Sequence, residues 1–186
     1  SAISMMMKVV DALESRYIPG LDASHALTGR AQCSVNVIRG GTQVNIVPAS
    51  CEVQVDRRVV PGEKAQSVIP AVEDVLNELR RNEDKMNVLQ TEPDIIFPPL
   101  DPTGNEAFIA FVQGKLKEMQ LSCEPMGVGF GTNASSFNGT GIPAIIIGPG
   151  DIAQAHTSDE WIDLEQLRQG EAVYLNLMRS QIRLED

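Results

Sequence analysis

The stretch CEVQVDRRVV (residues 51–60) decides the fold of the first half of this chain. Apolar and polar residues alternate along it, which is typical of a β-strand with one buried face. The residues predicted to point to the polar face are Glu52, Gln54, Asp56 and Arg58. A second strand-like run, 32–39, precedes it across Gly40-Gly41, so the two runs are predicted to pair as a hairpin. The later strand is expected to cover residues 43–59 with a break at Pro48.

Helical patterns flank the hairpin on both sides. Residues 2–16 place apolar side chains on one face, whereas residues 22–29 are expected to form a loop. After Pro61-Gly62-Glu63, apolar residues recur at helical spacing between 65 and 79. Residues 86–91 are predicted to be a short strand. The resulting order, α-β-β-α-β, is that of a ferredoxin-like half-sandwich without its first strand.

Four prolines separate this half from the next: Pro93, Pro98, Pro99 and Pro102. They predict a linker, so residues 1–92 and 93–186 are expected to be separate domains. The second half is predicted to contain helices near 104–120, 132–138 and 164–182, and strands that end near Met126 and cover 143–147. This order predicts the edge of an α/β sheet, too small to be a complete domain. The chain is therefore expected to have a mixed α/β fold.

Composition excludes several classes of partner. The 186 residues carry a formal net charge of −10 and a pI near 4.6, which argues against nucleic acid or an anionic membrane as partner. No apolar run reaches the roughly 18 residues that a membrane helix requires, and the first residues do not resemble a signal peptide. Cys33, Cys51 and Cys123 lack CxxC spacing, so reduced thiols in a cytoplasmic protein are expected.

A histidine near the C-terminus is the first candidate for chemistry. His156 follows the apolar run 143–147 and the turn 148–150, and open α/β sheets place ligands and catalytic groups just beyond such strands. The chain has one other histidine, His25, in an expected loop without a partner pattern. A lone histidine in a loop is more often structural or exposed than a ligand. If His156 holds a metal, most of the other ligands are not in this sequence.

A glycine-rich run, Gly127–Gly131, is the second candidate. It opens a predicted helix, so its free backbone N–H groups would suit an anionic ligand. The alternative is a plain turn between strand and helix, capped by Thr132 or Asn133.

Asn45 and Arg58 are the third candidate. They are expected at one edge of the small sheet, where an amide and a guanidinium would suit a substrate carboxylate. The alternative is that Arg58 forms an ion pair with Asp56 or Glu52 on a solvated face.

Several motifs follow one another along the chain. They are Val37–Gly41, Asn45–Pro48, Val55–Arg58, Pro61–Glu63, Phe130–Phe137, Gly141–Pro143, Gly148–Gly150 and Ala155–Glu160. Each motif alone is loose, but their shared order and spacing are specific. Across essentially its whole length the sequence resembles the zinc-dependent acetylornithine deacetylase, succinyl-diaminopimelate desuccinylase, aminoacylase and carboxypeptidase G2 superfamily. Gln154-Ala155-His156 followed by Asp159-Glu160 is most similar to the acetylornithine deacetylase branch.

This resemblance implies a di-zinc α/β catalytic domain with an inserted ferredoxin-like lid through which the family forms homodimers. Residues 1–92 would be most of that lid or dimerisation domain, and residues 93–186 would be the C-terminal part of the catalytic domain. His156 matches the last metal ligand of the family. The implied cofactor is zinc, two ions in the intact enzyme, with cobalt or manganese as alternatives.

The resemblance also implies substrate-binding residues. Asn45 and Arg58 match lid residues that bind the carboxylate of the substrate, in some members across the dimer. Strand alternation favours Arg58 over Arg57 for this role, because Arg58 shares the polar face. Gly131 and Thr132 match a backbone-rich loop beside the substrate.

The family requires further residues that this sequence lacks. It has no His-x-Asp pair and no Glu-Glu dipeptide, and Asn133 replaces the aspartate that is common in the family. No catalytic residue is therefore expected in this chain, which is expected to be cut from a longer one. The predicted function is that of part of a metal-dependent amidohydrolase acting on N-acyl amino acids or peptide-like substrates, with the isolated chain inactive. The alternative is a non-catalytic dimerisation or binding module.

Overall fold

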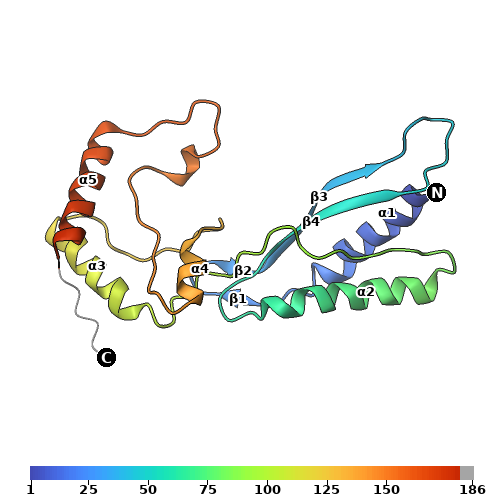
Figure 1. The fold of residues 1–186 in the computed structure, drawn as a ribbon, viewed down its shortest axis with the longest axis horizontal. Coiled ribbons are helices and arrows are strands. Elements are labelled where there is room, and N and C mark those ends of the chain that lie inside the picture. The colour runs from blue at the N-terminus through green and yellow to red at the C-terminus, as the bar shows by residue number, and fades with distance from the viewer. Residues whose placement is uncertain (181–186) are drawn as a thin grey trace. The chain divides into compact units, whose positions relative to one another are not determined.

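The hairpin expected from the alternating sequence is present. The structure is a computed structural model that describes residues 1–180 (Figure 1). Strand β3 (Gln32–Gly40) pairs antiparallel with strand β4 (Cys51–Arg58). Gln32 lies opposite Arg58 at one end of this ladder, and the connecting loop leaves from the other end.

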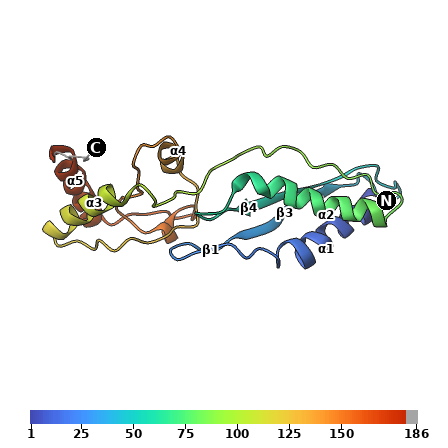
Figure 2. The ribbon, with the colours of Figure 1, turned by 90° about the horizontal axis from the view of Figure 1, so that it is seen from below.

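Two helices form one core with this hairpin. Helix α1 (Ala2–Ala12) continues into a π-helical turn (Leu13–Tyr17), and helix α2 (Val68–Asn82) packs against both (Figures 1 and 2). The buried apolar residues of this core are Val9, Ala12, Leu13, Tyr17, Leu76, Leu79 and Val88. Cys33 and Val35 of β3 pack against this cluster, so the helices and the hairpin exclude water from a shared interior.

In the first half of the chain, one predicted strand and one predicted loop are wrong, and the later hairpin strand begins at Cys51 and not at residue 43. Residues 86–91 form no ladder, although Val88 is buried. The carbonyl oxygen of Val88 accepts hydrogen bonds from the Arg80 guanidinium, at 3.2 Å from Nε and 2.6 Å from Nη2. A buried carbonyl must be paired, and here a side chain takes the place of a neighbouring strand. Within the expected loop, β1 (Ser24–His25) and β2 (Gly29–Arg30) form a small antiparallel ladder.

The later part of the chain, as far as the structure describes it, contains helices α3 (Glu106–Glu118), α4 (Ala134–Gly139) and α5 (Leu164–Arg179). Helices α3 and α5 pack against each other. The strands predicted to end near Met126 and to cover 143–147 do not form, because neither segment has a ladder partner within residues 1–180. The expectation that the last helix reaches Ile182 extends into residues 181–186, which lie outside the described residues.

The chain divides into two units. The first contains Ser1–Pro99 and Gly127–Gly131, and the second contains Leu100–Met126 and the chain from Thr132 onward. Helices and antiparallel strands together confirm the mixed α/β class. Among the helices described within residues 1–180, none is long and apolar enough to cross a membrane.

The substitution Leu76→Ala tests the shared core. Leu76 is 3% exposed, so truncation leaves a cavity, and we expect the free energy of unfolding to fall by about 2–5 kcal/mol. Leu89→Ala is the matched control, because Leu89 is 82% exposed and its truncation should change stability by less than about 0.5 kcal/mol. Urea unfolding followed by circular dichroism measures both. Equal losses for the two variants would contradict this packing.

Candidate functional site

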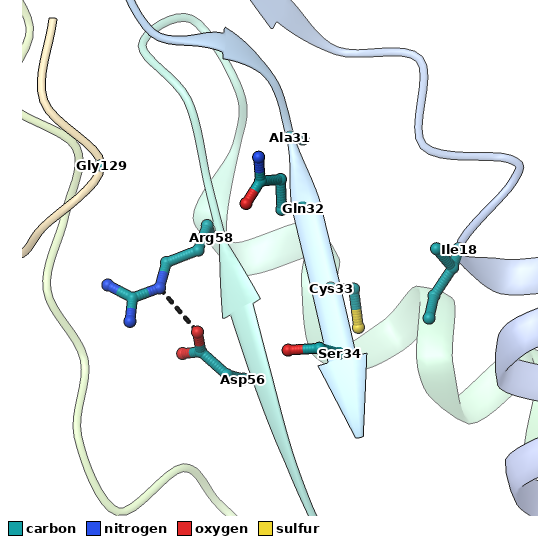
Figure 3. Close-up of a pocket in the computed structure, with 8 residues that line it drawn as sticks. All are labelled: Ile18, Ala31, Gln32, Cys33, Ser34, Asp56, Arg58 and Gly129. Carbon is teal, nitrogen blue, oxygen red and sulfur yellow. Dashed lines mark hydrogen bonds and ion pairs between the residues drawn. The ribbon is translucent and has the colours of Figure 1, made fainter. Parts of the chain in front are cut away.

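Polar side chains gather on one face of the β3–β4 hairpin and line a depression of about 480 Å3 (Figure 3). The polar lining residues are Gln32, Ser34, Asp56 and Arg58, and the others are Ile18, Ala31, Cys33 and Gly129. Gln32 lies opposite Arg58, and Ser34 lies opposite Asp56. Because directly opposed residues on an antiparallel pair point to the same face, the register alone brings these four side chains together.

Arg58 is the cation of this depression. Its Nε lies 2.6 Å from Oδ2 of Asp56, and the two side chains are 51% and 42% exposed. The ion pair agrees with the alternative drawn from the sequence, but it engages only one nitrogen of the guanidinium. Among residues 1–180, no partner contacts the two terminal nitrogens of Arg58. Such an edge can bind a carboxylate through two parallel hydrogen bonds.

Arg57, the preceding residue, points to the other face and is largely buried. Its Nε donates to the Tyr17 hydroxyl oxygen at 3.2 Å, and its Nη2 donates to a carboxylate oxygen of Glu63. The side chains of Arg57 and Glu63 are 10% and 13% exposed. Burial lowers the pKa of Arg57, but the hydrogen bonds to Tyr17 and Glu63 outweigh burial, so the net pKa is raised. The pKa of Tyr17 is also raised, because the effect of burial exceeds the opposing effect of the Arg57 cation.

The buried ion pair is a feature that the sequence reading missed. Glu63 belongs to the turn that opens α2, and its other carboxylate oxygen accepts the Val60 amide at 3.2 Å. One side chain therefore closes the turn and neutralises Arg57. The spacing in the sequence could have predicted this ion pair. Glu63 follows Arg57 by six residues across the turn Pro61-Gly62, so its side chain can fold back onto the strand.

Asn45 does not lie beside Arg58, so the expectation of one shared sheet edge is wrong. Asn45 is exposed in the loop that joins β3 to β4, whereas Arg58 lies at the far end of β4 (Figure 1). The 8 residues of β4 span roughly 23 Å at the rise of an extended strand. A hairpin separates its loop from its open end, so one chain cannot bring both side chains to one small carboxylate.

The glycine-rich loop matches the plain-turn alternative in its local geometry. A Cβ atom on Gly131 would lie 3.3 Å from the Phe97 ring, so this backbone packs closely on an aromatic side chain. Of the two capping candidates, Thr132 makes the bond, because its Oγ1 accepts the Ala134 amide at 3.2 Å. Asn133 makes no side-chain cap bond to α4. Gly131 and Thr132 are sequence neighbours that belong to different units.

His156 lies in an exposed turn of the second unit. Its backbone φ is 61°, and its amide donates to Oε2 of Glu160 at 3.3 Å. A left-handed conformation is uncommon for a residue other than glycine and requires support from its surroundings. Within residues 1–180, no three His, Cys, Asp or Glu side chains come together to hold a metal. Because zinc takes about four ligands, these residues do not by themselves form the zinc site implied by the resemblance.

Known proteins match this chain in both sequence and fold. Residues 1–84 match the family described as a peptidase dimerisation domain. An acetylornithine deacetylase from Myxococcus xanthus is 34% identical over 140 residues, which is 75% of this chain and 35% of that protein. An N-acetyl-L-citrulline deacetylase from Xanthomonas campestris pv. campestris is 54% identical over 46 residues, 24% of this chain and 13% of that protein. The chain thus spans about a third of the length of the first relative, and its match covers a smaller share of the second.

The fold is similar to that of a tripeptidase from Staphylococcus aureus subsp. aureus mu50. The TM-score is 0.65 and the sequence identity is 19%, and the match covers 96% of this chain and 45% of that chain. A dimerisation domain, deacetylase relatives and a peptidase fold together define one class of protein. The chain belongs to the M20 superfamily of peptidases and deacetylases, which confirms the resemblance drawn from the motifs.

Substituting the two neighbouring arginines tests whether their environments differ as described. Arg57→Ala leaves the carboxylate of Glu63 largely buried without its cation, so we expect a loss of about 3–5 kcal/mol of unfolding free energy. Arg58→Ala removes a half-exposed ion pair, so we expect a loss below about 1 kcal/mol. Urea unfolding of both variants measures the difference. A loss for Arg58→Ala as large as that for Arg57→Ala would contradict these two environments.

Proposed function

We propose that this chain is part of a metal-dependent amidohydrolase that cleaves the amide bond of N-acyl amino acids or peptide-like substrates. Membership of a superfamily of peptidases and deacetylases supports the proposal. Two of the relatives are named as deacetylases of acetylornithine and of N-acetyl-L-citrulline, both acylated amino acids. We assign residues 1–92 to the lid and residues 93–186 to the C-terminal part of the catalytic domain.

The observation that carries this proposal is the half-exposed guanidinium of Arg58. Its Nε is held by Asp56 at 2.6 Å, which orients the guanidinium plane, and its two terminal nitrogens point away from Asp56 (Figure 3). An N-acyl amino acid carries a carboxylate close to its amide bond. Two hydrogen bonds from Arg58 to that carboxylate would fix the direction of the amide and orient it for reaction.

Asn45 would reach the same carboxylate only from a second copy of the chain. The length of β4 separates Asn45 from Arg58 in one copy. A homodimer through the lid removes this conflict, because the hairpin loop of one copy can approach the open hairpin end of the other. The match of residues 1–84 to a dimerisation domain supports such an arrangement.

We further assign Gly131 and Thr132 to the loop beside the substrate and His156 to metal ligation, as the resemblance implies. Zinc, or cobalt or manganese in its place, would polarise the amide carbonyl in the intact enzyme. A single imidazole is at most one of its ligands, so the remaining ligands would have to come from outside residues 1–180. The contribution of its own residues is to bind and orient the substrate through Arg58 and Asn45.

A second candidate function is a non-catalytic dimerisation module. The dimerisation-domain match over residues 1–84 favours it. The two functions differ in whether the polar depression binds a ligand. A module that only dimerises has no use for an oriented guanidinium with unengaged nitrogens.

The isolated chain is expected to be inactive. It contributes one histidine toward a site that needs several ligands and a base, so no release of free amino acid from N-acetyl amino acids is expected, with or without added zinc. His156→Ala, assayed in parallel, distinguishes a contaminating hydrolase, whose activity the substitution would not change. Substantial zinc-dependent turnover that disappears in His156→Ala would overturn the assignment of this chain as a catalytically incomplete part.

Mixing two variants tests whether the carboxylate site is shared between copies. Asn45→Ala and Arg58→Ala chains are each expected to lose binding of an N-acetyl amino acid, measured by ligand-observed NMR. An equimolar mixture, unfolded and refolded together, is expected to regain part of the binding, because a mixed dimer restores one site with both side chains. Sedimentation velocity must show a dimer in each sample. A mixture that stays as weak as its components would contradict a shared site.

A further inference from the structure

The segment 140–151, which follows α4, belongs to no helix and no sheet within residues 1–180. Side chains of the flanking helices hold it instead. At its start, the Ala144 amide donates to Oδ1 of Asn105 at 2.9 Å. Asn105 is 1% exposed, and its side-chain nitrogen Nδ2 donates to the backbone carbonyl oxygen of Asp101 at 3.1 Å. The beginning of the segment is therefore anchored to the start of α3.

The end of the same segment is anchored to α5. The Tyr174 hydroxyl donates to the carbonyl oxygen of Ile147 at 2.7 Å, and the Gly150 amide donates to Oε1 of Gln166 at 3.0 Å. Gln166 and Tyr174 are eight residues apart on α5, so they lie on one face of the helix. These two hydrogen bonds bracket the turn Gly148-Pro149-Gly150 on both sides.

Gly170 lies midway between these two residues on the same helix face. It is buried, and a Cβ atom there would lie 2.8 Å from Cγ and 3.0 Å from Cδ of Pro149. A proline ring cannot swing away as a flexible side chain can, so any larger residue would push the turn off the helix. Glycine is a poor helix former, and the close approach of Pro149 explains its presence in the interior of α5.

A continuous set of local bonds leads from this turn to His156. Oδ1 of Asp151 accepts the Ala153 amide at 2.9 Å and caps the short 3-10 turn Ile152–Gln154. The Thr157 hydroxyl donates to the carbonyl oxygen of Gln154 at 2.7 Å. Little freedom remains between the clamped turn and the left-handed backbone of His156. A displacement of the turn therefore displaces the imidazole.

We propose that Gln166, Gly170 and Tyr174 are positioning residues that set the location of the His156 imidazole through the turn 148–150. This inference rests on the proposed function, in which His156 is a site residue. The side chains of Gln166 and Tyr174, and the space left by the missing Cβ of Gly170, act on the clamped backbone and not on the reacting atoms.

The histidine ring signals of the chain test this proposal without any activity measurement. The sequence contains two histidines, and His25 belongs to the other unit, so its ring signal is an internal reference. In the 13C-histidine NMR spectrum, Gly170→Ala is expected to shift or broaden the His156 ring signal and to leave that of His25 in place. Gly114→Ala is the matched control, because Gly114 is in α3 and a Cβ there meets nothing within 4 Å.

Tyr174→Phe keeps the inference testable if Gly170→Ala fails to fold. It removes only the hydroxyl, so α5 should persist while the His156 ring signal moves and hydrogen exchange at the Gly150 amide speeds up. A His156 signal that stays unchanged in Tyr174→Phe and in Gln166→Leu would overturn the proposal. The variant-mixing experiment on Arg58 reads ligand binding and not ring position, so failure of the proposed function is recognised separately.

Discussion

The two-residue period of β4 is the constraint on which the rest of this structure depends. Neighbouring side chains on a strand point to opposite faces, so Arg57 enters the interior while Arg58 faces the polar depression. The guanidinium of Arg57 bonds to Glu63 and Tyr17, and that of Arg58 bonds to Asp56. A slip of one residue would exchange the two arginines and leave a buried charge without its partner. Stability and the candidate site therefore rely on the same register.

Side chains replace missing strands at several places in both units. Arg80 pairs the carbonyl oxygen of Val88, and Asn105 pairs the amide of Ala144. Each of these segments has the apolar character of a strand, yet it has no neighbouring strand among the described residues. Buried backbone groups need hydrogen bonds, and long polar side chains from adjacent helices supply them.

The residues proposed for substrate and metal binding come from separate parts of the chain. Asn45, Arg58 and Gly131 belong to the first unit, and Thr132 and His156 belong to the second. The hairpin keeps Asn45 away from Arg58 within one copy, so the shared carboxylate site proposed above would need two copies of the chain.

Local patterns in the sequence determined the helices, the hairpin and the superfamily, because helix and strand periods are properties of neighbouring residues. Helices α1, α2 and α5 lie within or close to their predicted ranges, and the polar face of β4 carries Arg58 as expected. Only the tertiary structure decided that Glu63 neutralises Arg57, that Val88 pairs with a side chain, and that Asn45 lies far from Arg58. These outcomes depend on which groups meet across the fold. Such meetings are set by register, helix packing and the need to satisfy buried polar groups, none of which is visible in a window of neighbouring residues.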